Sequence, residues 1–191
     1  LEELDLPDSL TNIDDEAFLR CTQLYNINLD QCINLIRIGE ASFYNCYSLE
    51  ELTLPNSLTY IGDSAFSECN RLTSVKLPKN LKVIRDTTFE NCPKLTKIYF
   101  PDTLTKIGDG SFFKCTGLTE LTLPDTLTKI GDDAFYECSR LTKIRLPNNL
   151  TKIGDGAFQM CSGLTEVSLP ETLTDIGDKV FYECSRLTKI R

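Results

Sequence analysis

Residues 118–140 read LTELTLPDTLTKIGDDAFYECSR, and the pattern of this stretch recurs along the whole chain. Its phenylalanine returns first after 25 residues and then six times after 23: Phe18, Phe43, Phe66, Phe89, Phe112, Phe135, Phe158 and Phe181. Repetition at a fixed short period predicts stacked repeat units rather than a globular domain. The chain divides into units 1–23, 24–48, 49–71, 72–94, 95–117, 118–140, 141–163 and 164–186 and a partial unit 187–191. We interpret these units as one domain without linkers.

The first half of the unit has the pattern of a half-buried strand. Leu121 and Leu123 alternate with Glu120 and Thr122, so the leucines point inward and the polar residues outward. Pro124 ends the strand because proline has no N–H to donate to a neighbouring strand.

The second half of the unit predicts a second short extended piece, a corner and a helical turn. Leu127 and Ile130 point inward again, and Gly131 allows a tight corner. Asp132 is a favourable N-cap for a short helical turn, on which Phe135 and Cys138 share the inner face.

A single coil of this kind cannot bury its own apolar edge, whereas stacked coils can. The sequence therefore predicts an α/β solenoid of about eight 23-residue coils. We expect one parallel sheet on one face and short helical turns on the other. Strands in a sheet lie about 4.8 Å apart, so the rod should be roughly 40 Å long.

The motifs L-x-x-L-x-L and I-G-x-x-A-F-x-x-C resemble leucine-rich repeats of the BspA-like class of bacterial and protist surface proteins. The resemblance covers the whole chain, although a Pro-Asp-Thr or Pro-Asp-Ser loop replaces the Asn or Cys that follows the strand in other leucine-rich repeats. It implies a curved solenoid, located extracellularly or at the cell surface, that adheres to proteins, including host extracellular or matrix proteins. Since the chain begins and ends inside the pattern, we expect it to be a fragment of a longer protein.

Composition excludes several classes of function. The net charge of −8 argues against a nucleic-acid binder and against docking on an anionic membrane. The absence of histidine removes the commonest general base and the commonest zinc ligand. No apolar run is long enough for membrane insertion. We therefore predict a protein that is not an enzyme and that uses no cofactor and no metal.

Eight of the nine cysteines follow the repeated phenylalanine by three residues and form one column, which we interpret as buried free thiols. Disulfides between coils are a second interpretation, since neighbouring coils bring cysteines within bonding reach; metal binding is a third. Cys32 lies outside the column, in a loop that makes its unit two residues longer than the others. We name it as the best candidate for an exposed thiol; the alternative is that it tucks under the enlarged loop.

An acidic residue precedes each phenylalanine by three positions: Asp15, Glu40, Asp63, Asp86, Asp109, Asp132, Asp155 and Asp178. We call these residues the acidic column. The favoured interpretation is a series of helix N-caps. The alternative is a Ca²⁺ site, as in some repeat proteins, but each coil offers only one or two carboxylates.

The outward residues of the first strand are the candidate binding site, because the solenoid leaves them free to vary. The candidates are the cations and the tyrosine of this face: Lys76, Lys97, Tyr99, Lys143, Arg145, Lys189 and Arg191. Tyrosine and arginine are favoured interface anchors. One row alternates in charge through Lys97, Glu120, Lys143, Glu166 and Lys189, which favourable pairing across neighbouring strands also explains.

Two functions follow from this face. The first is a non-catalytic protein-binding module in cell-surface adhesion, with the candidate residues contacting an acidic or polar protein surface. The alternative is a structural spacer, or a rod that self-associates end to end, without a specific ligand.

Overall fold

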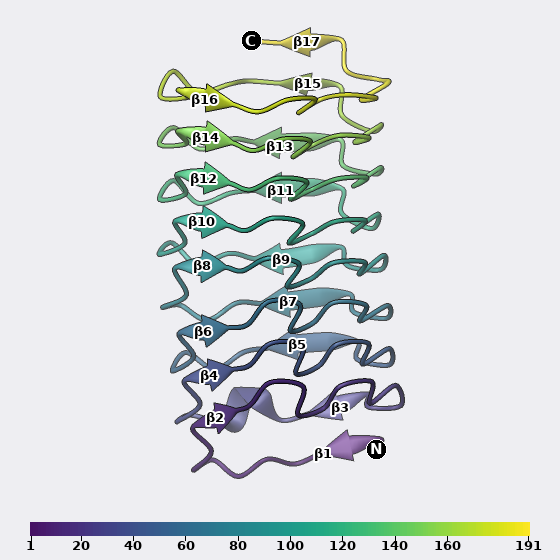
Figure 1. Cartoon of the computed structure of the whole chain (residues 1–191), viewed down its shortest axis with the longest axis vertical. Coiled ribbons are helices and arrows are strands. Elements are labelled where there is room, and N and C mark those ends of the chain that lie inside the picture. The colour runs from purple at the N-terminus through teal and green to yellow at the C-terminus, as the bar shows by residue number, and fades with distance from the viewer.

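The computed structural model describes residues 1–191 as a β-solenoid, with coils stacked along one long axis (Figure 1). Each coil contributes a strand to each of two columns of strands. The column on what we call the first-strand face contains β1 (Glu3–Leu4), β3 (Asn26–Ile27), β5 (Glu51–Thr53), β7 (Ser74–Lys76), β9 (Lys97–Tyr99), β11 (Glu120–Thr122), β13 (Lys143–Arg145), β15 (Glu166–Val167) and β17 (Lys189–Ile190). The second-strand face contains β2 (Asn12–Ile13), β4 (Arg37–Ile38), β6 (Tyr60–Ile61), β8 (Val83–Ile84), β10 (Lys106–Ile107), β12 (Lys129–Ile130), β14 (Lys152–Ile153) and β16 (Asp175–Ile176).

All strand pairs are parallel, and each residue pairs with its equivalent in the next coil. The expectation of one parallel sheet was too simple, because the second extended piece of each coil forms sheets of its own. The longest sheet joins β8, β10, β12, β14 and β16 on the second-strand face. The first-strand face is divided into β1-β3, β5-β7-β9, β11-β13 and β15-β17.

The predicted helical turns are absent, and the chain is a β-solenoid rather than an α/β solenoid. Each coil places two residues of its third side at positive φ, as at Asp133 (φ 50°) and Glu137 (φ 55°). A right-handed helix cannot continue through such residues. The backbone instead bonds to the next coil, where the Phe135 N–H donates to the Ala157 carbonyl at 2.8 Å. The only helical segment is η1 (Leu29–Gln31), a single 3-10 turn in the enlarged loop.

The core runs the length of the solenoid, and the repeated phenylalanines stack along its axis. Neighbouring ring centroids lie between 5.2 and 5.8 Å apart. The six rings from Phe43 to Phe158 are completely buried. The predicted inward positions are confirmed, since Leu121, Leu127 and Ile130 are all buried. Stacked aromatic pairs add to the stabilisation that burial alone provides.

The nine cysteines are free thiols, and eight of them are buried. In the column, each thiol from Cys46 onward donates to the carbonyl of the phenylalanine in the preceding coil, as from Cys115 Sγ to Phe89 O at 3.1 Å. Burial raises the pKa of Cys46 to about 12. The expectation of an exposed Cys32 was wrong: it is completely buried directly after η1, and its thiol donates to the Asn28 carbonyl oxygen at 3.6 Å.

The acidic column does not cap helices. Five of its eight carboxylates accept a backbone N–H of the next coil instead, as Asp109 Oδ1 accepts the N–H of Asp132 at 3.0 Å. Position 131 requires glycine because the Asp109 side chain approaches its backbone closely: a Cβ at this position would lie 2.2 Å from the same carboxylate oxygen. Arg85 stands where most other coils have this glycine, and its guanidinium pairs with Asp63 at 3.9 Å. No group of three or more Asp, Glu, Cys or His is placed to hold a metal ion.

Candidate functional site

The first-strand face presents two rows of outward side chains, as the sequence predicts. Strand pairing places Ser74 beside Lys97 in one row and Lys76 beside Tyr99 in the other. The same rows continue through β11 and β13, where Glu120 pairs with Lys143. The seven candidate residues therefore lie on one continuous face, with neighbouring coils supplying consecutive members of each row.

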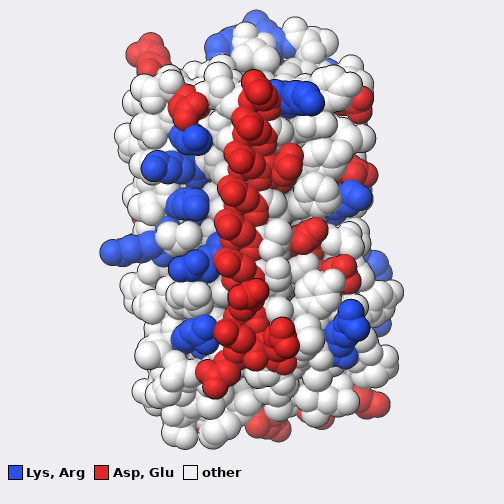
Figure 2. All heavy atoms as spheres, viewed as in Figure 1, with Lys and Arg blue, Asp and Glu red and all other residues white.

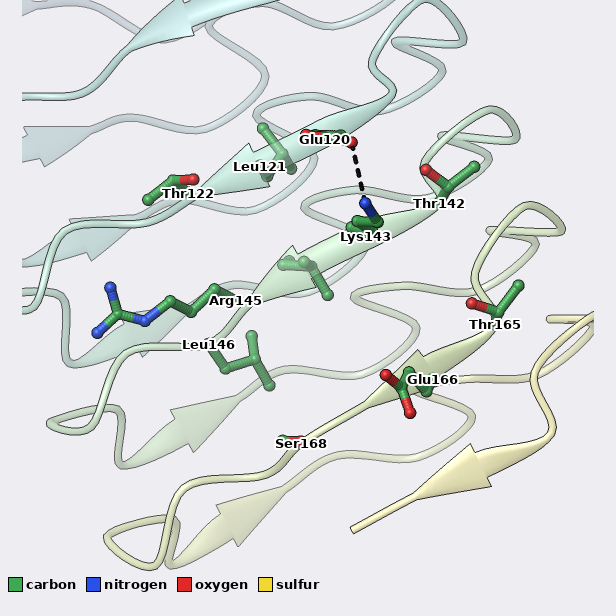
Figure 3. Close-up of a pocket in the computed structure, with 11 residues that line it drawn as sticks. Glu120, Leu121, Thr122, Thr142, Lys143, Arg145, Leu146, Thr165, Glu166 and Ser168 are labelled. Carbon is green, nitrogen blue, oxygen red and sulfur yellow. Dashed lines mark ion pairs between the residues drawn. The ribbon is translucent and has the colours of Figure 1, made fainter.

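A shallow hollow of about 450 Å³ lies over β11, β13 and β15 (Figure 3). Its lining comes from three successive coils: Glu120, Leu121, Thr122, Thr142, Lys143, Ile144, Arg145, Leu146, Thr165, Glu166 and Ser168. The hollow includes the interruption of the sheet, since β13 and β15 are not hydrogen-bonded to each other. Two of the candidate residues, Lys143 and Arg145, line it.

Three of the candidate cations already have acidic partners within the chain. Lys143 Nζ lies 3.6 Å from Glu120 Oε1, the pair marked in Figure 3. The guanidinium of Arg145 lies 3.4 Å from a carboxylate oxygen of Asp125. Arg191 lies 3.7 Å from a carboxylate oxygen of Glu166. A ligand that used these three cations would have to compete with the internal partners.

The remaining candidates are free of such pairs. Lys76, Lys97 and Lys189 have no acidic group within 4.0 Å, and all three are exposed. Tyr99 is 58% exposed, although tyrosine rings usually bury most of their surface. Lys76 and Tyr99 line a second hollow of about 450 Å³ with Leu52, Thr53 and Ser74. Two of the three accessible cations and the accessible aromatic ring thus gather on β7 and β9, while Lys189 lies apart on β17.

The alternating charges of the first row form fewer pairs than the sequence indicates. Glu120 pairs with Lys143, but Glu166 pairs with Arg191 of the other row rather than with a lysine of its own. Lys97 stays unpaired although Glu120 follows it in the row. The sheet is interrupted between β9 and β11 and between β13 and β15. The charge ladder is therefore not a continuous structural feature, and Lys97 is left available to a ligand.

The sequence reasoning missed the charges of the second-strand face. Lys106, Lys129 and Lys152 occupy equivalent outward positions on β10, β12 and β14. Their signal in the sequence was the stretch T-K-I-G, which occurs in three consecutive units. Nearer the N-terminus the Tyr60 ring lies between the guanidinium groups of Arg37 and Arg85, at 5.1 and 4.5 Å from the ring centroid.

The family signature described as "BspA type Leucine rich repeat region (6 copies)" matches residues 1–108 and 82–191, which together span the chain. The chain belongs to the BspA-type leucine-rich repeat family. No curated protein matches it.

Several solved structures resemble this BspA-type solenoid. The leucine-rich repeat protein of T. pallidum has 31% identity and a TM-score of 0.76, covering 97% of this chain and 78% of that one. The pneumococcal vaccine antigen PcpA has 26% identity and a TM-score of 0.66, covering all of this chain and 50% of that one. A leucine-rich cell surface protein of Faecalibacterium prausnitzii has 21% identity and a TM-score of 0.55, with coverage of 100% and 72%, and indicates the fold alone.

The BspA-type repeat supports a coarse functional assignment, which is a role in protein interaction or at a surface. The strand face provides ammonium, guanidinium, hydroxyl and phenol groups, which suit non-covalent recognition of a polar partner. No helix of the chain has the length and apolar character needed to cross a membrane.

Proposed function

We propose that this chain is a non-catalytic protein-binding module that acts in adhesion at the cell surface. The observation that carries the proposal is the exposed ring of Tyr99 between two lysines, Lys76 and Lys97, that have no acidic partner in the chain. An aromatic anchor with flanking cations suits an acidic or polar protein surface. The family, together with the vaccine antigen among the similar structures, supports the extracellular location.

The rigidity of the face also supports the proposal. Lys76 and Tyr99 lie on paired strands: the inward neighbours of Lys76, Val75 and Leu77, are buried in the core, and those of Tyr99, Ile98 and Phe100, are half-buried and pack against it. A preorganised side chain loses less conformational entropy on binding than one on a mobile loop. Within the seven candidates, the group on β7 and β9 therefore forms the centre of the proposed site. Lys143, Arg145, Lys189 and Arg191 extend it toward the C-terminus.

A binding screen tests this function. The wild-type chain and a variant with Lys76→Glu, Tyr99→Ala and Lys97→Glu are compared against a panel of extracellular matrix and serum proteins. A second variant, Lys106→Glu with Lys129→Glu, changes the net charge by the same amount on the other face. We expect a partner that binds the wild type and the control but loses at least tenfold affinity for the first variant, with an unchanged melting temperature.

Two results would contradict the proposed site. A partner lost equally in both variants would respond to net charge rather than to the β7–β9 group. No partner in the panel would shift the assignment to the alternative function, a structural spacer or an end-to-end rod. The single core cluster, which is continuous from coil to coil, is the observation that favours that alternative.

A further inference from the structure

The second-strand face carries two parallel rows of opposite charge. We define the basic row by the cations at the outward positions of β4, β10, β12 and β14: Arg37, Lys106, Lys129 and Lys152. Three residues after each of them stands a member of the acidic column. Figure 2 shows the acidic column as a continuous red stripe along the long axis, with blue side chains beside it.

Like charges within each row repel each other, and the chain neutralises the rows only in part: Arg37 pairs with Asp15 at 2.9 Å, and Arg85 pairs with Asp63 at 3.9 Å. Lys106, Lys129 and Lys152 are direct partners on neighbouring strands, and like charges in that position are destabilising. Of these three lysines only Lys152 has an acidic partner, with Nζ 3.0 Å from Asp175 Oδ2. Lys106 and Lys129 have none within 4.0 Å and are exposed. A partner that brings opposite charge to each row would relieve both repulsions.

The spacing of the rows restricts what that partner can be. It must offer positive and negative charges side by side, each repeating about every 4.8 Å, which is the spacing of stacked strands. An anionic polymer would match the basic row but would be repelled by the acidic column next to it. A solenoid with the same repeat matches both rows, and this chain itself has that repeat.

We propose that the second-strand face is an interface for a second copy of this chain. A two-fold axis parallel to the long axis places each basic row against the partner's acidic column. In that arrangement three coils align opposite charges in both directions: Lys106 with Asp109, Lys129 with Asp132 and Lys152 with Asp155. A two-fold axis across the long axis would instead place lysine against lysine. The two copies therefore lie side by side, with their N-termini at the same end.

The expected association is weak and sensitive to salt. A strip of seven coils and both rows buries about 500 Å² on each copy, below the roughly 800 Å² of a standard interface. Exposed ion pairs are individually weak and are screened by salt. Asp175 faces an acidic residue of the partner, and the net charge of −8 opposes approach. The dimer should form at high protein concentration and low ionic strength.

Sedimentation velocity tests the interface at about 0.02 M and about 0.3 M salt. We expect dimers of the wild type at the low salt concentration and monomers at the high one. Lys106→Glu, Lys129→Glu and Lys152→Glu together should weaken dimerisation at least tenfold. The matched control is Lys76→Glu, Lys97→Glu and Lys189→Glu, which changes the net charge equally on the first-strand face and should weaken it much less.

The orientation has its own test by disulfide trapping. Two single variants, Lys129→Cys and Asp132→Cys, are mixed under mild oxidation. The native cysteines interfere little, because all but Cys21 are buried. The proposed arrangement joins Lys129→Cys of one copy to Asp132→Cys of the other. Faster disulfide formation between two copies of Lys129→Cys would overturn the parallel arrangement.

Three further results would overturn the proposal. The first is a wild type that stays monomeric at low salt. The second is a dimer that both triple variants weaken equally. The third is a monomeric wild type that binds a heparin column through Lys106, Lys129 and Lys152, which would assign the basic row to anionic polymers.

Discussion

Replacing Phe112 by alanine should remove a large part of the stability of the solenoid. The ring is completely buried and stacks between Phe89, at 5.6 Å, and Phe135, at 5.3 Å. Burial of a phenylalanine side chain contributes about 2 kcal/mol. A residual cavity of about 100 Å³ adds about 2.4 kcal/mol, and lost stacking adds about 0.5 kcal/mol or more. We expect a decrease of about 4–5 kcal/mol in the free energy of unfolding.

The position of the ring in the stack supplies the control. Phe18 is only half-buried and stacks with one ring, Phe43 at 5.2 Å, so Phe18→Ala should cost about 1–2 kcal/mol. Phe112→Leu keeps most of the volume and should cost about 1 kcal/mol. Urea unfolding followed by circular dichroism measures all three, since the chain has no tryptophan for fluorescence. The reasoning fails if Phe112→Ala costs less than about 2 kcal/mol, or no more than Phe18→Ala.

Four other predictions follow from the contacts between coils. Gly131→Ala should lower the free energy of unfolding by about 3 kcal/mol, because the new Cβ would lie 2.7 Å from backbone atoms of the preceding coil. Gly110→Ala should lower it by about 1 kcal/mol, because the Cβ there meets only a side chain, at 3.2 Å. Equal losses for the two variants in urea unfolding would contradict this reasoning. Glu137→Gly should be neutral or stabilising by up to about 1 kcal/mol, because the residue has φ 55°, and a clear loss of melting temperature would argue against this backbone. A thiol reagent should modify Cys21 first, since the other cysteines are buried. Mass spectrometry of the labelled peptides identifies which cysteine reacts first. Burial raises the pKa of the Cys46 thiol to about 12, so at alkaline pH the folded state keeps a proton that the unfolded state loses. The free energy of unfolding should therefore be unaffected below a pH of about 8.5 and should fall as the pH rises from there toward 12. Urea unfolding at several pH values measures this decrease.

Sequence periodicity was sufficient for the coil and for its inward residues. Leu121, Leu127 and Phe135 recur at fixed positions, and an apolar side chain at the same position in every coil can be buried only by stacking. The candidate face was also predictable, because outward positions alternate with inward ones in a strand. The sequence could not separate Lys97 from Lys143, since both neighbour Glu120 in their row and the choice of partner depends on side-chain directions across neighbouring strands.

The third side of the coil shows where sequence reasoning reached its limit. The positive-φ positions hold residues as different as Asp133, Glu137 and Met160, so the residue type at these positions does not predict the conformation. An aspartate before a short apolar stretch is a favourable helix N-cap, and local propensity alone therefore favoured a helix. The bond from the Phe135 N–H to Ala157 of the next coil overrides that propensity. Such a bond exists only once the coils are stacked.

The sequence by itself thus determined the repeat, its BspA-type family, the two extended pieces and the side chains that form the core. These features depend on which residues recur and at what spacing. Only the tertiary structure decided the backbone of the third side and the partners of the exposed lysines. Each of these depends on contacts that residues distant in the chain make after stacking. Such contacts cannot be predicted from a local stretch of sequence.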